Sequence, residues 1–247
     1  MSATTGTRVV SETGDLIAAP AITDVINGAS FEPGIEAGSW VTIRGANLAN
    51  TSPGRIWRNE EVVGGKLPTA LDGVSVTING KPAFVYYISA TQINVQAPSD
   101  TAVGPVSVVV TNNGAVSAPA TAQLQVAAPA FFLWPNTKSA VTTFGPQYLH
   151  VGDPSLTPGA IPAHAGDVVI LWATGFGPTS PAALAGTVIL PNPDIPVVAA
   201  PVSVTVGGQP ADLISTVLAP YSVGLYQIAI RLPANLPTGA VAVQATK

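Results

Sequence analysis

The sequence predicts an all-β protein made of two tandem antiparallel β-sandwiches. The first observation is an internal repeat, because residues 73–83 return as residues 201–211 at an offset of 128. The second is a period-two alternation of apolar and polar residues in several short segments, which buries one side of each strand. The third is the composition, with 24 glycines, 24 prolines and only 9% charged residues. Because glycine and proline interrupt helices, this composition favours short strands joined by turns.

The composition also argues against several classes of function. A hydrophobic content of 47% with a net charge of −4 supplies the apolar surface that a disordered chain lacks. The nine Lys and Arg residues form no cluster of four or more, so nucleic acid is not an expected partner. The chain has no cysteine, which excludes disulfides and thiolate metal sites. No apolar run reaches the roughly 18 to 20 residues of a membrane span, so we expect no membrane insertion.

Residues 1–19 are predicted to form an N-terminal tail. It is polar apart from two short apolar pairs. Alternatively, the tail leaves its own domain as a donated strand that extends a neighbour's sheet through main-chain hydrogen bonds. The residues of such a strand are Thr7, Val9, Val10, Leu16 and Ile17. The sequence starts without the basic and apolar regions of a signal peptide, so an extracellular protein would have lost its leader before this start.

The first predicted sandwich spans residues 20–127. Strands are expected in four segments with β-branched residues or period-two alternation: residues 38–45, 74–78, 92–97 and 106–111. Asn79 and Gly80 stand between two runs of strand residues. Asn-Gly is a strong hairpin signal, because a type I′ turn needs a positive φ angle at both central residues.

The second predicted sandwich spans residues 128–247. Its strands are expected at residues 168–174, 202–206, 227–232 and 241–244. Gly207 and Gly208 replace the Asn-Gly pair and meet the same backbone requirement. The offset rises to 135 between Gln92 and Gln227, which places an insertion of seven residues around positions 215–224.

Three segments carry a family resemblance. Residues 37–48 (AGSWVTIRGANL), followed by residues 74–80 and 92–98, resemble the IPT/TIG type of immunoglobulin-like domain. As a whole, residues 22–246 resemble an uncharacterised C-terminal region of large exported acidobacterial proteins, most specifically at residues 173–178 and 224–228. The resemblance implies two immunoglobulin-like sandwiches in an extracellular or cell-surface setting, and it carries no known functional residues.

The two histidines form the only metal-like pattern, and each starts a His-x-Gly-Asp sequence. The residues involved are His150, Asp153, His164 and Asp167. Imidazole and carboxylate are suitable metal ligands. However, Gly-Asp is an ordinary turn pair, so we expect neither a metal nor another cofactor.

The inventory of catalytic groups is poor. No Gly-x-Ser-x-Gly sequence occurs, and no histidine stands where it would activate a nucleophile. The adjacent acids Glu60 and Glu61 would point to opposite faces of a strand, so they do not form a glycosidase pair. We therefore expect a protein that is not an enzyme.

The segment at residues 55–61 (RIWRNEE) is the most distinctive loop. It contains four charged residues and one tryptophan, whereas its counterpart at residues 183–189 has neither. Aromatic and arginine side chains supply much of the binding energy at interfaces, so this loop is a candidate contact surface. Its members are Arg55, Trp57, Arg58, Glu60 and Glu61. The competing interpretation folds Trp57 back onto its own domain. The other tryptophans, Trp40, Trp134 and Trp172, are expected in the core.

The sequence favours a non-catalytic extracellular structural or adhesion module. Its expected partner is protein, either another copy or the modules of a host protein. One alternative is a self-assembling surface or filament subunit that donates its N-terminal strand. The other is a carbohydrate-binding module that uses the loop around Trp57. Fold alone does not choose among these three functions.

Overall fold

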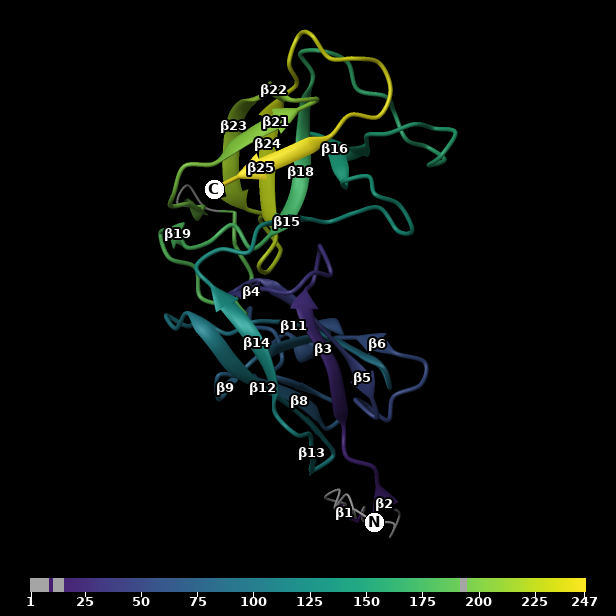
Figure 1. Ribbon diagram of the computed structural model, residues 1–247, viewed down its shortest axis with the longest axis vertical. Coiled ribbons are helices and arrows are strands. Elements are labelled where there is room, and N and C mark those ends of the chain that lie inside the picture. The colour runs from purple at the N-terminus through teal and green to yellow at the C-terminus, as the bar shows by residue number, and fades with distance from the viewer. Residues whose placement is uncertain (1–8, 11–15, 192–194) are drawn as a thin grey trace. The chain divides into compact units, whose positions relative to one another are not determined.

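A computed structural model describes residues 9–10, 16–191 and 195–247. Its regular secondary structure consists of β-strands and one short helical turn (Figure 1). The contacts divide the chain into two compact units. The first contains the chain up to Val126 together with Leu184–Val188, and the second contains Ala127–Ala183 and Ile189–Lys247. The all-β prediction is confirmed. Within the described ranges the one helical element is a short 3₁₀ turn, η1, at Asn59–Glu61.

Two sheets form the sandwich of the first unit. The five-stranded sheet has the order β3-β5-β11-β10-β6. Its strands are β3 (Ala21–Asn27), β5 (Trp40–Ala46), β11 (Gln92–Gln96), β10 (Phe84–Ile88) and β6 (Arg55–Ile56). All four pairings in this sheet are antiparallel. The buried side chains of this sheet belong to the core of the first unit.

The second sheet of this unit has the order β4-β14-β12-β8-β7, with β13 attached to β12 and β9 attached to β8. The strands are β4 (Ile35–Glu36), β14 (Ala120–Gln125), β12 (Gly104–Asn112), β8 (Val74–Ile78), β7 (Ala70–Leu71), β13 (Ala115–Val116) and β9 (Lys81–Pro82). Only the short pair of β4 with β14 is parallel.

The predicted alternation produces the core of the first unit. Val74, Val76 and Ile78 of β8 are buried, whereas Ser75 and Thr77 between them are partly exposed. The same pattern in β5 and β11 sends four β-branched side chains inward: Val41, Ile43, Ile93 and Val95. Each large aliphatic side chain that is fully buried contributes about 1.5–3 kcal/mol, so these inward rows are the main source of stability.

The predicted hairpin turns are confirmed in both units. Asn79 and Gly80 have φ angles of 51° and 72°, and Ile78 pairs with Lys81 across the turn. Gly207 and Gly208 have φ angles of 59° and 77°. The demand for positive φ, rather than any side-chain chemistry, explains why two different residue pairs fill the same position.

The larger sheet of the second unit has the order β17-β16-β18-β24-β23-β20-β19, with β15 attached to β18. The strands are β17 (Leu149–His150), β16 (Thr142–Phe144), β18 (Val168–Thr174), β24 (Tyr226–Arg231), β23 (Asp212–Leu218), β20 (Val197–Val198), β19 (Thr179–Ser180) and β15 (Ala130–Phe131). The predicted insertion is visible as a longer β23 and a longer connection to β24.

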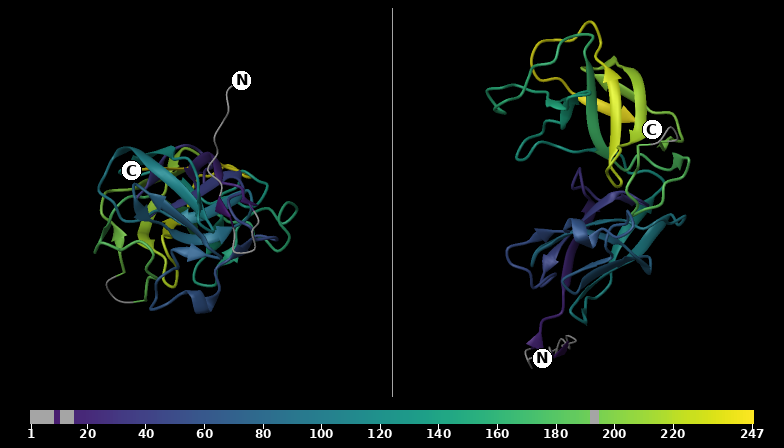
Figure 2. Two further views of the ribbon diagram at one scale, coloured as in Figure 1. Left: turned by 90° about the horizontal axis from the view of Figure 1, so that it is seen from below. Right: turned by 180° about the vertical axis from the view of Figure 1, so that it is seen from behind.

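The smaller sheet of the second unit has the order β22-β21-β25. Its strands are β22 (Gln209–Pro210), β21 (Ser203–Val206) and β25 (Val243–Thr246), and the two further views show them with the larger sheet of this unit (Figure 2). The core of this unit is built on buried aliphatic and aromatic residues, including Leu171, Phe176, Ile228 and Ile230.

The N-terminal segment contains a short antiparallel ladder. β1 (Val9–Val10) pairs with β2 (Leu16–Ile17), with Val9 opposite Ile17 and Val10 opposite Leu16. These four members of the predicted donated strand therefore pair with one another. Thr7, the fifth member, lies outside the described residues. Donation of this segment as one extended strand stays a prediction, and it requires the ladder to open.

Candidate binding face on the five-stranded sheet

Three aromatic side chains gather at one end of the five-stranded sheet in the first unit. They are Trp40 at the start of β5, Trp57 just after β6 and Tyr86 in β10. The ring centroids of Trp57 and Tyr86 lie 4.5 Å apart, and those of Trp40 and Tyr86 lie 5.4 Å apart. Trp40 and Trp57 are stacked at 6.4 Å with 23° between their planes. We call Trp40, Trp57 and Tyr86 the aromatic cluster.

The strand register places Trp40 on the outer side of the sheet, and ring contacts hold Trp57 and Tyr86 beside it. Val41 and Ile43 of β5 point into the core, so Trp40, Thr42 and Arg44 point outward. In β10 the register shifts between Val85 and Tyr87, which adds Tyr86 as an extra residue opposite β11. Such a bulge redirects a side chain, and here the ring of Tyr86 meets both tryptophans.

All three rings of the aromatic cluster are half-buried. Trp57 also packs against the core of its unit. Trp57 was interpreted either as part of a contact surface or as a side chain folded back onto its own domain. Both apply in part, because Trp57 is anchored in its own domain and still reaches the surface. A partly exposed ring that is fixed in place offers apolar area without a large loss of side-chain entropy.

Arg55 holds the loop that carries Trp57. Its two terminal nitrogens, Nη1 and Nη2, donate to Glu61 Oε2 and Oε1, both at 2.9 Å. Nε donates to Asp72 Oδ2 at 2.8 Å and Nη2 donates to Asp72 Oδ1 at 2.5 Å. Nη1 also donates to the carbonyl of Ile56 at 3.1 Å. All five N–H donors of the guanidinium are thereby engaged within the unit.

The ionisation of this network is shifted in favour of the charged forms. Hydrogen bonds from Arg55 lower the pKa of the Glu61 carboxyl and that of the Asp72 carboxyl. Hydrogen bonds to Asp72 and Glu61 raise the pKa of Arg55 above its ordinary value. The backbone N–H of Arg58 donates to Glu61 Oε2 at 2.6 Å, so the same carboxylate also fixes the start of η1.

The five residues of the predicted contact loop therefore fall into two groups. Arg55 and Glu61 are half-buried and engaged with each other, so they position the loop. Trp57 belongs to the aromatic cluster, and Arg58 and Glu60 are exposed beside it. Use of this loop as a contact surface stays a prediction, with Trp57, Arg58 and Glu60 as the members that reach solvent.

Sequence reasoning missed Trp40 and Tyr86 as members of this face. Trp40 was expected in the core, but it is half-buried, as are Trp134 and Trp172. The alternation along residues 40–44 does mark Trp40 as outward-facing, because Val41 and Ile43 define the inward side of β5. Tyr86 gives no such signal, since its direction depends on the bulge in β10.

Polar side chains accompany the aromatic cluster on the same sheet. Asn94 Oδ1 accepts hydrogen bonds from Gln92 Nε2 at 2.9 Å and from Thr42 Oγ1 at 3.3 Å. At the β3 side, the guanidinium of Arg44 lies 5.3 Å from the centre of the Phe31 ring. The face thus combines rings with amide and guanidinium groups, a composition that suits a ligand with apolar surfaces and hydroxyl groups.

The His-x-Gly-Asp residues do not assemble. His150 packs edge-on against Trp134 at 4.5 Å, and Asp153 Oδ1 accepts two hydrogen bonds from Ser155. His164 Nδ1 lies 3.6 Å from Asp167 Oδ2, whose main interaction is with the backbone N–H of His164 at 2.7 Å. Within the described part of the chain, no group of three or more His, Cys, Asp or Glu residues is arranged to hold a metal ion.

Comparison with a protein-family model identifies the class of the first unit. Residues 29–126 match the IPT/TIG domain, so this unit contains an immunoglobulin-like domain of that type. The match does not extend to the second unit, and the acidobacterial origin stays a prediction. The comparison with curated proteins gives no match.

Solved structures with similar parts include an enzyme and surface proteins. Gamma-CGTase from Bacillus clarkii is 15% identical with a TM-score of 0.31, and the match covers 68% of this chain and 28% of the enzyme. The surface glycan-binding protein PbSGBP-B from Prevotella bryantii is 14% identical with a TM-score of 0.25, covering 98% of this chain and 40% of that protein. SGBP-B from Bacteroides uniformis is 16% identical with a TM-score of 0.24, covering 92% and 46%. The chain spans less than half the length of each of these proteins.

No helix within residues 9–10, 16–191 and 195–247 is both long and apolar enough to cross a membrane.

Proposed function

We propose that the chain is a non-catalytic extracellular module that adheres to carbohydrate through the aromatic cluster of its IPT/TIG domain. The observation that carries this proposal is the fixed arrangement of Trp40, Trp57 and Tyr86 on the outer side of a sheet, next to amide groups. Sugar rings present C–H groups on one face and hydroxyls around the edge. Aromatic rings have an electron-rich face that attracts such C–H groups, while amides bond the hydroxyls.

The electrostatics of the face support a neutral ligand. Arg55 lies two residues before Trp57 in the sequence, and its donors are all engaged with Glu61, Asp72 and the Ile56 carbonyl. Arg58 and Glu60 are exposed with opposite charges. A strongly anionic or cationic ligand would therefore gain little from charge attraction at this loop, whereas a neutral glycan needs none.

Glycan-array binding with a matched pair of variants tests this proposal. Trp57→Ala removes one ring of the cluster, and Trp134→Ala removes a half-buried tryptophan from the second unit. We expect at least one class of glycan to bind the unmodified protein and the Trp134→Ala protein about equally. Loss of one stacking aromatic costs roughly 1–3 kcal/mol, which corresponds to binding weaker by about 5-fold to 150-fold for Trp57→Ala.

Two results would overturn the proposal. Equal signals from the unmodified protein and Trp57→Ala would remove the aromatic cluster from the binding function, and absence of any glycan signal would remove carbohydrate as the ligand. The non-catalytic part of the proposal has its own test. Hydrolase activity on peptide, ester or glycan substrates that one substitution abolishes would contradict it.

A further inference from the structure

The outer side of the five-stranded sheet carries a second aromatic group, on the side of β3. Phe31 follows β3, and 48% of its area is exposed. The guanidinium of Arg44 lies 5.3 Å from the centre of its ring, which is within the range of a cation–π contact. Arg44 points outward from β5, because Ile43 before it is buried in the core. We call Phe31 and Arg44 the β3-side pair.

The turn after β3 holds Phe31 in a conformation that is unusual for a bulky residue. Its φ angle is 59°, in the left-handed region. The side-chain oxygen of Asn27 accepts hydrogen bonds from the N–H groups of Ala29 at 2.9 Å and Ser30 at 3.2 Å. The carbonyl of Asn27 accepts the N–H of Phe31 at 3.0 Å. These bonds maintain the strained backbone, so the exposed ring is fixed in place.

This turn is attached directly to the aromatic cluster. The backbone N–H of Gly28 donates to the carbonyl of Trp40 at 2.8 Å. A Cβ atom at Gly28 would lie 2.9 Å from the carbonyl carbon and oxygen of Trp40, so the close approach depends on glycine. The turn that carries Phe31 and the start of β5 are therefore held in one arrangement.

The guanidinium of Arg44 is available to a ligand. Among the residues that the structure describes, its side chain has no hydrogen-bond or ion-pair partner, and its ring contact is with Phe31. The donors of Arg55, by contrast, are all engaged within the unit. An arginine presents five N–H donors in a planar fork, so Arg44 offers several donors at an exposed position.

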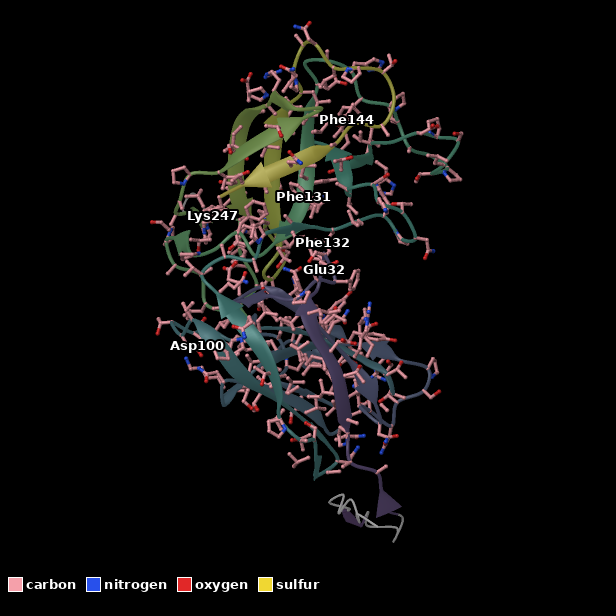
Figure 3. The ribbon with its side chains drawn as sticks, in the orientation of Figure 1. Glu32, Asp100, Phe131, Phe132, Phe144 and Lys247 are labelled. Carbon is pink, nitrogen blue, oxygen red and sulfur yellow. The ribbon has the colours of Figure 1, made fainter. Side chains whose placement is uncertain are left out.

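The charges around the β3-side pair do not favour an anion. Asp24 lies opposite Arg44 in the register of β3 and β5, and both residues are exposed. Glu32, which Figure 3 labels, is the exposed residue next to Phe31. Two carboxylates near one guanidinium oppose the approach of an anionic ligand. The donors of Arg44 therefore suit neutral oxygen atoms such as those of hydroxyl groups.

A row of amide side chains lies between the two aromatic groups. In the register of β5 and β11, Arg44 lies opposite Gln92 and Thr42 lies opposite Asn94. Asn94 Oδ1 is engaged with Gln92 Nε2 and Thr42 Oγ1. Within the described ranges, Asn94 Nδ2 and Gln92 Oε1 have no hydrogen-bond partner. The row thus offers one donor group and one acceptor, which matches hydroxyls because a hydroxyl both donates and accepts.

We propose that the glycan site continues across the sheet to Phe31 and Arg44, so that its ligand is a neutral chain of several sugar residues. This inference rests on the proposed function and adds the length of the ligand. Trp57 follows β6 and Phe31 follows β3, which are the two edge strands of the sheet. Four spacings of about 4.8 Å between neighbouring strands place these edges about 19 Å apart. One sugar ring is too small to reach both.

Oligosaccharide ladders with the full chain test this inference. The probes are the series of one to six sugar residues from cellulose, mannan and unsubstituted xylan, titrated by calorimetry. For at least one series, we expect the affinity of the unmodified protein to rise by about tenfold or more between the disaccharide and the hexasaccharide. The gain arises because only the longer ligand reaches the β3-side pair in addition to the aromatic cluster.

Two variants and a matched control assign this gain to the β3-side pair. Phe31→Ala should bind the hexasaccharide about fivefold or more weakly and leave disaccharide affinity unchanged. Arg44→Met keeps an apolar stem without the donors and should show the same pattern. Tyr221→Ala is the control, since Tyr221 also has a φ angle of 59° and is 76% exposed, but belongs to the second unit. It should leave both affinities unchanged.

The outcomes separate this inference from the proposed function. Equal hexasaccharide affinity of Phe31→Ala and the unmodified protein, or no gain beyond the disaccharide, would overturn the extension alone, because Trp57→Ala still tests the aromatic cluster. An equal loss for both ligand lengths in Phe31→Ala would also overturn it, since the substitution would then act through the cluster. Absence of binding to all three series would overturn the inference as well, while the glycan array decides the proposed function.

Discussion

Asp100 accepts a hydrogen bond from the side-chain amide of Asn79 at 2.9 Å and thereby ties the tip of the β8–β9 hairpin to the loop before β12. The same carboxylate accepts the backbone N–H of Ala102 at 3.0 Å and forms an ion pair with Lys81 at 3.0 Å. Only 7% of the Asp100 side chain is exposed. Figure 3 labels this residue in the first unit.

Replacement of Asp100 should destabilise the protein. Asp100→Ala leaves three donors without their acceptor, so we expect the free energy of unfolding to fall by about 1–3 kcal/mol. Urea denaturation followed by tryptophan fluorescence measures this change. Glu60→Ala, at an exposed position of η1, is the control and should change the unfolding free energy by less than about 0.5 kcal/mol. A loss as small as that of the control would show that the hairpin contact is not stabilising.

Asp100 should also make stability depend on acid pH. The N–H of Ala102, the Asn79 amide and Lys81 lower the pKa of its carboxyl in the folded protein. The unfolded chain binds this proton near the ordinary value of about 3.9, so the stabilisation is complete above that pH and is lost as pH falls toward the folded-state pKa. The difference in unfolding free energy between the unmodified protein and Asp100→Asn should therefore be largest at neutral pH and shrink below about pH 4. A difference that grows on acidification would contradict this assignment.

The pair of Arg55 and Glu61 should show a measurable coupling energy. Both side chains are partly buried, with 17% and 25% of their areas exposed, and the contact is bidentate. A double-mutant cycle with Arg55→Ala and Glu61→Ala should give about 1–2 kcal/mol, more than an exposed pair gives. Trp57 emission should shift in Arg55→Ala because its loop is released. A coupling near zero with unchanged emission would remove Arg55 from its positioning role.

The two hairpin turns should respond alike to the same substitution. Gly80 and Gly208 both have positive φ angles, and neither has an atom within 4 Å of the position a Cβ would take. Gly80→Ala and Gly208→Ala should each lower the unfolding free energy by about 1–2 kcal/mol through backbone strain alone. Gly80→Asn is the matched control and should cost less, because asparagine tolerates this conformation. Equal costs for alanine and asparagine would point to a cause other than φ.

Gly186 should be more sensitive than either turn glycine. It has a φ angle of 77°, and an added Cβ would overlap the ring of Phe84. Its N–H donates to Gln96 Oε1 at 2.6 Å, so the segment Leu184–Val188 is held closely on the first unit. Gly186→Ala should lower the free energy of unfolding by more than about 2 kcal/mol. The part of this loss that exceeds the loss in Gly80→Ala comes from the steric overlap with Phe84. In the Phe84→Ala background the cost of Gly186→Ala should be smaller, because the clashing ring is gone. Strictly additive costs of the two substitutions would contradict the predicted clash.

The sequence predicted the fold well where local rules decide it. Val74, Val76 and Ile78 are inward as their alternation requires, and the positive φ angles of Asn79 and Gly80 follow from turn chemistry. The sequence did not predict that Leu184–Val188 belongs to the first unit. This association depends on tertiary contacts such as the hydrogen bond between Gly186 and Gln96. No periodicity in the segment encodes such a contact.

The candidate site was predicted only in part. The loop around Trp57 stood out by its composition, since its repeat counterpart lacks charge and tryptophan. The engagement of Arg55 with both Glu61 and Asp72 could not be foreseen, because Asp72 lies 17 residues away in another connection. Tyr86 was missed because a register shift in β10, invisible in the alternation pattern, sets its direction.

The saturated guanidinium of Arg55 has a thermodynamic consequence for recognition. A loop whose anchor already makes five internal hydrogen bonds has little conformational freedom left to lose when a ligand arrives. Contact with Trp57 should therefore proceed as docking onto a preorganised surface, with calorimetry reporting only a small entropic penalty from ordering of the protein.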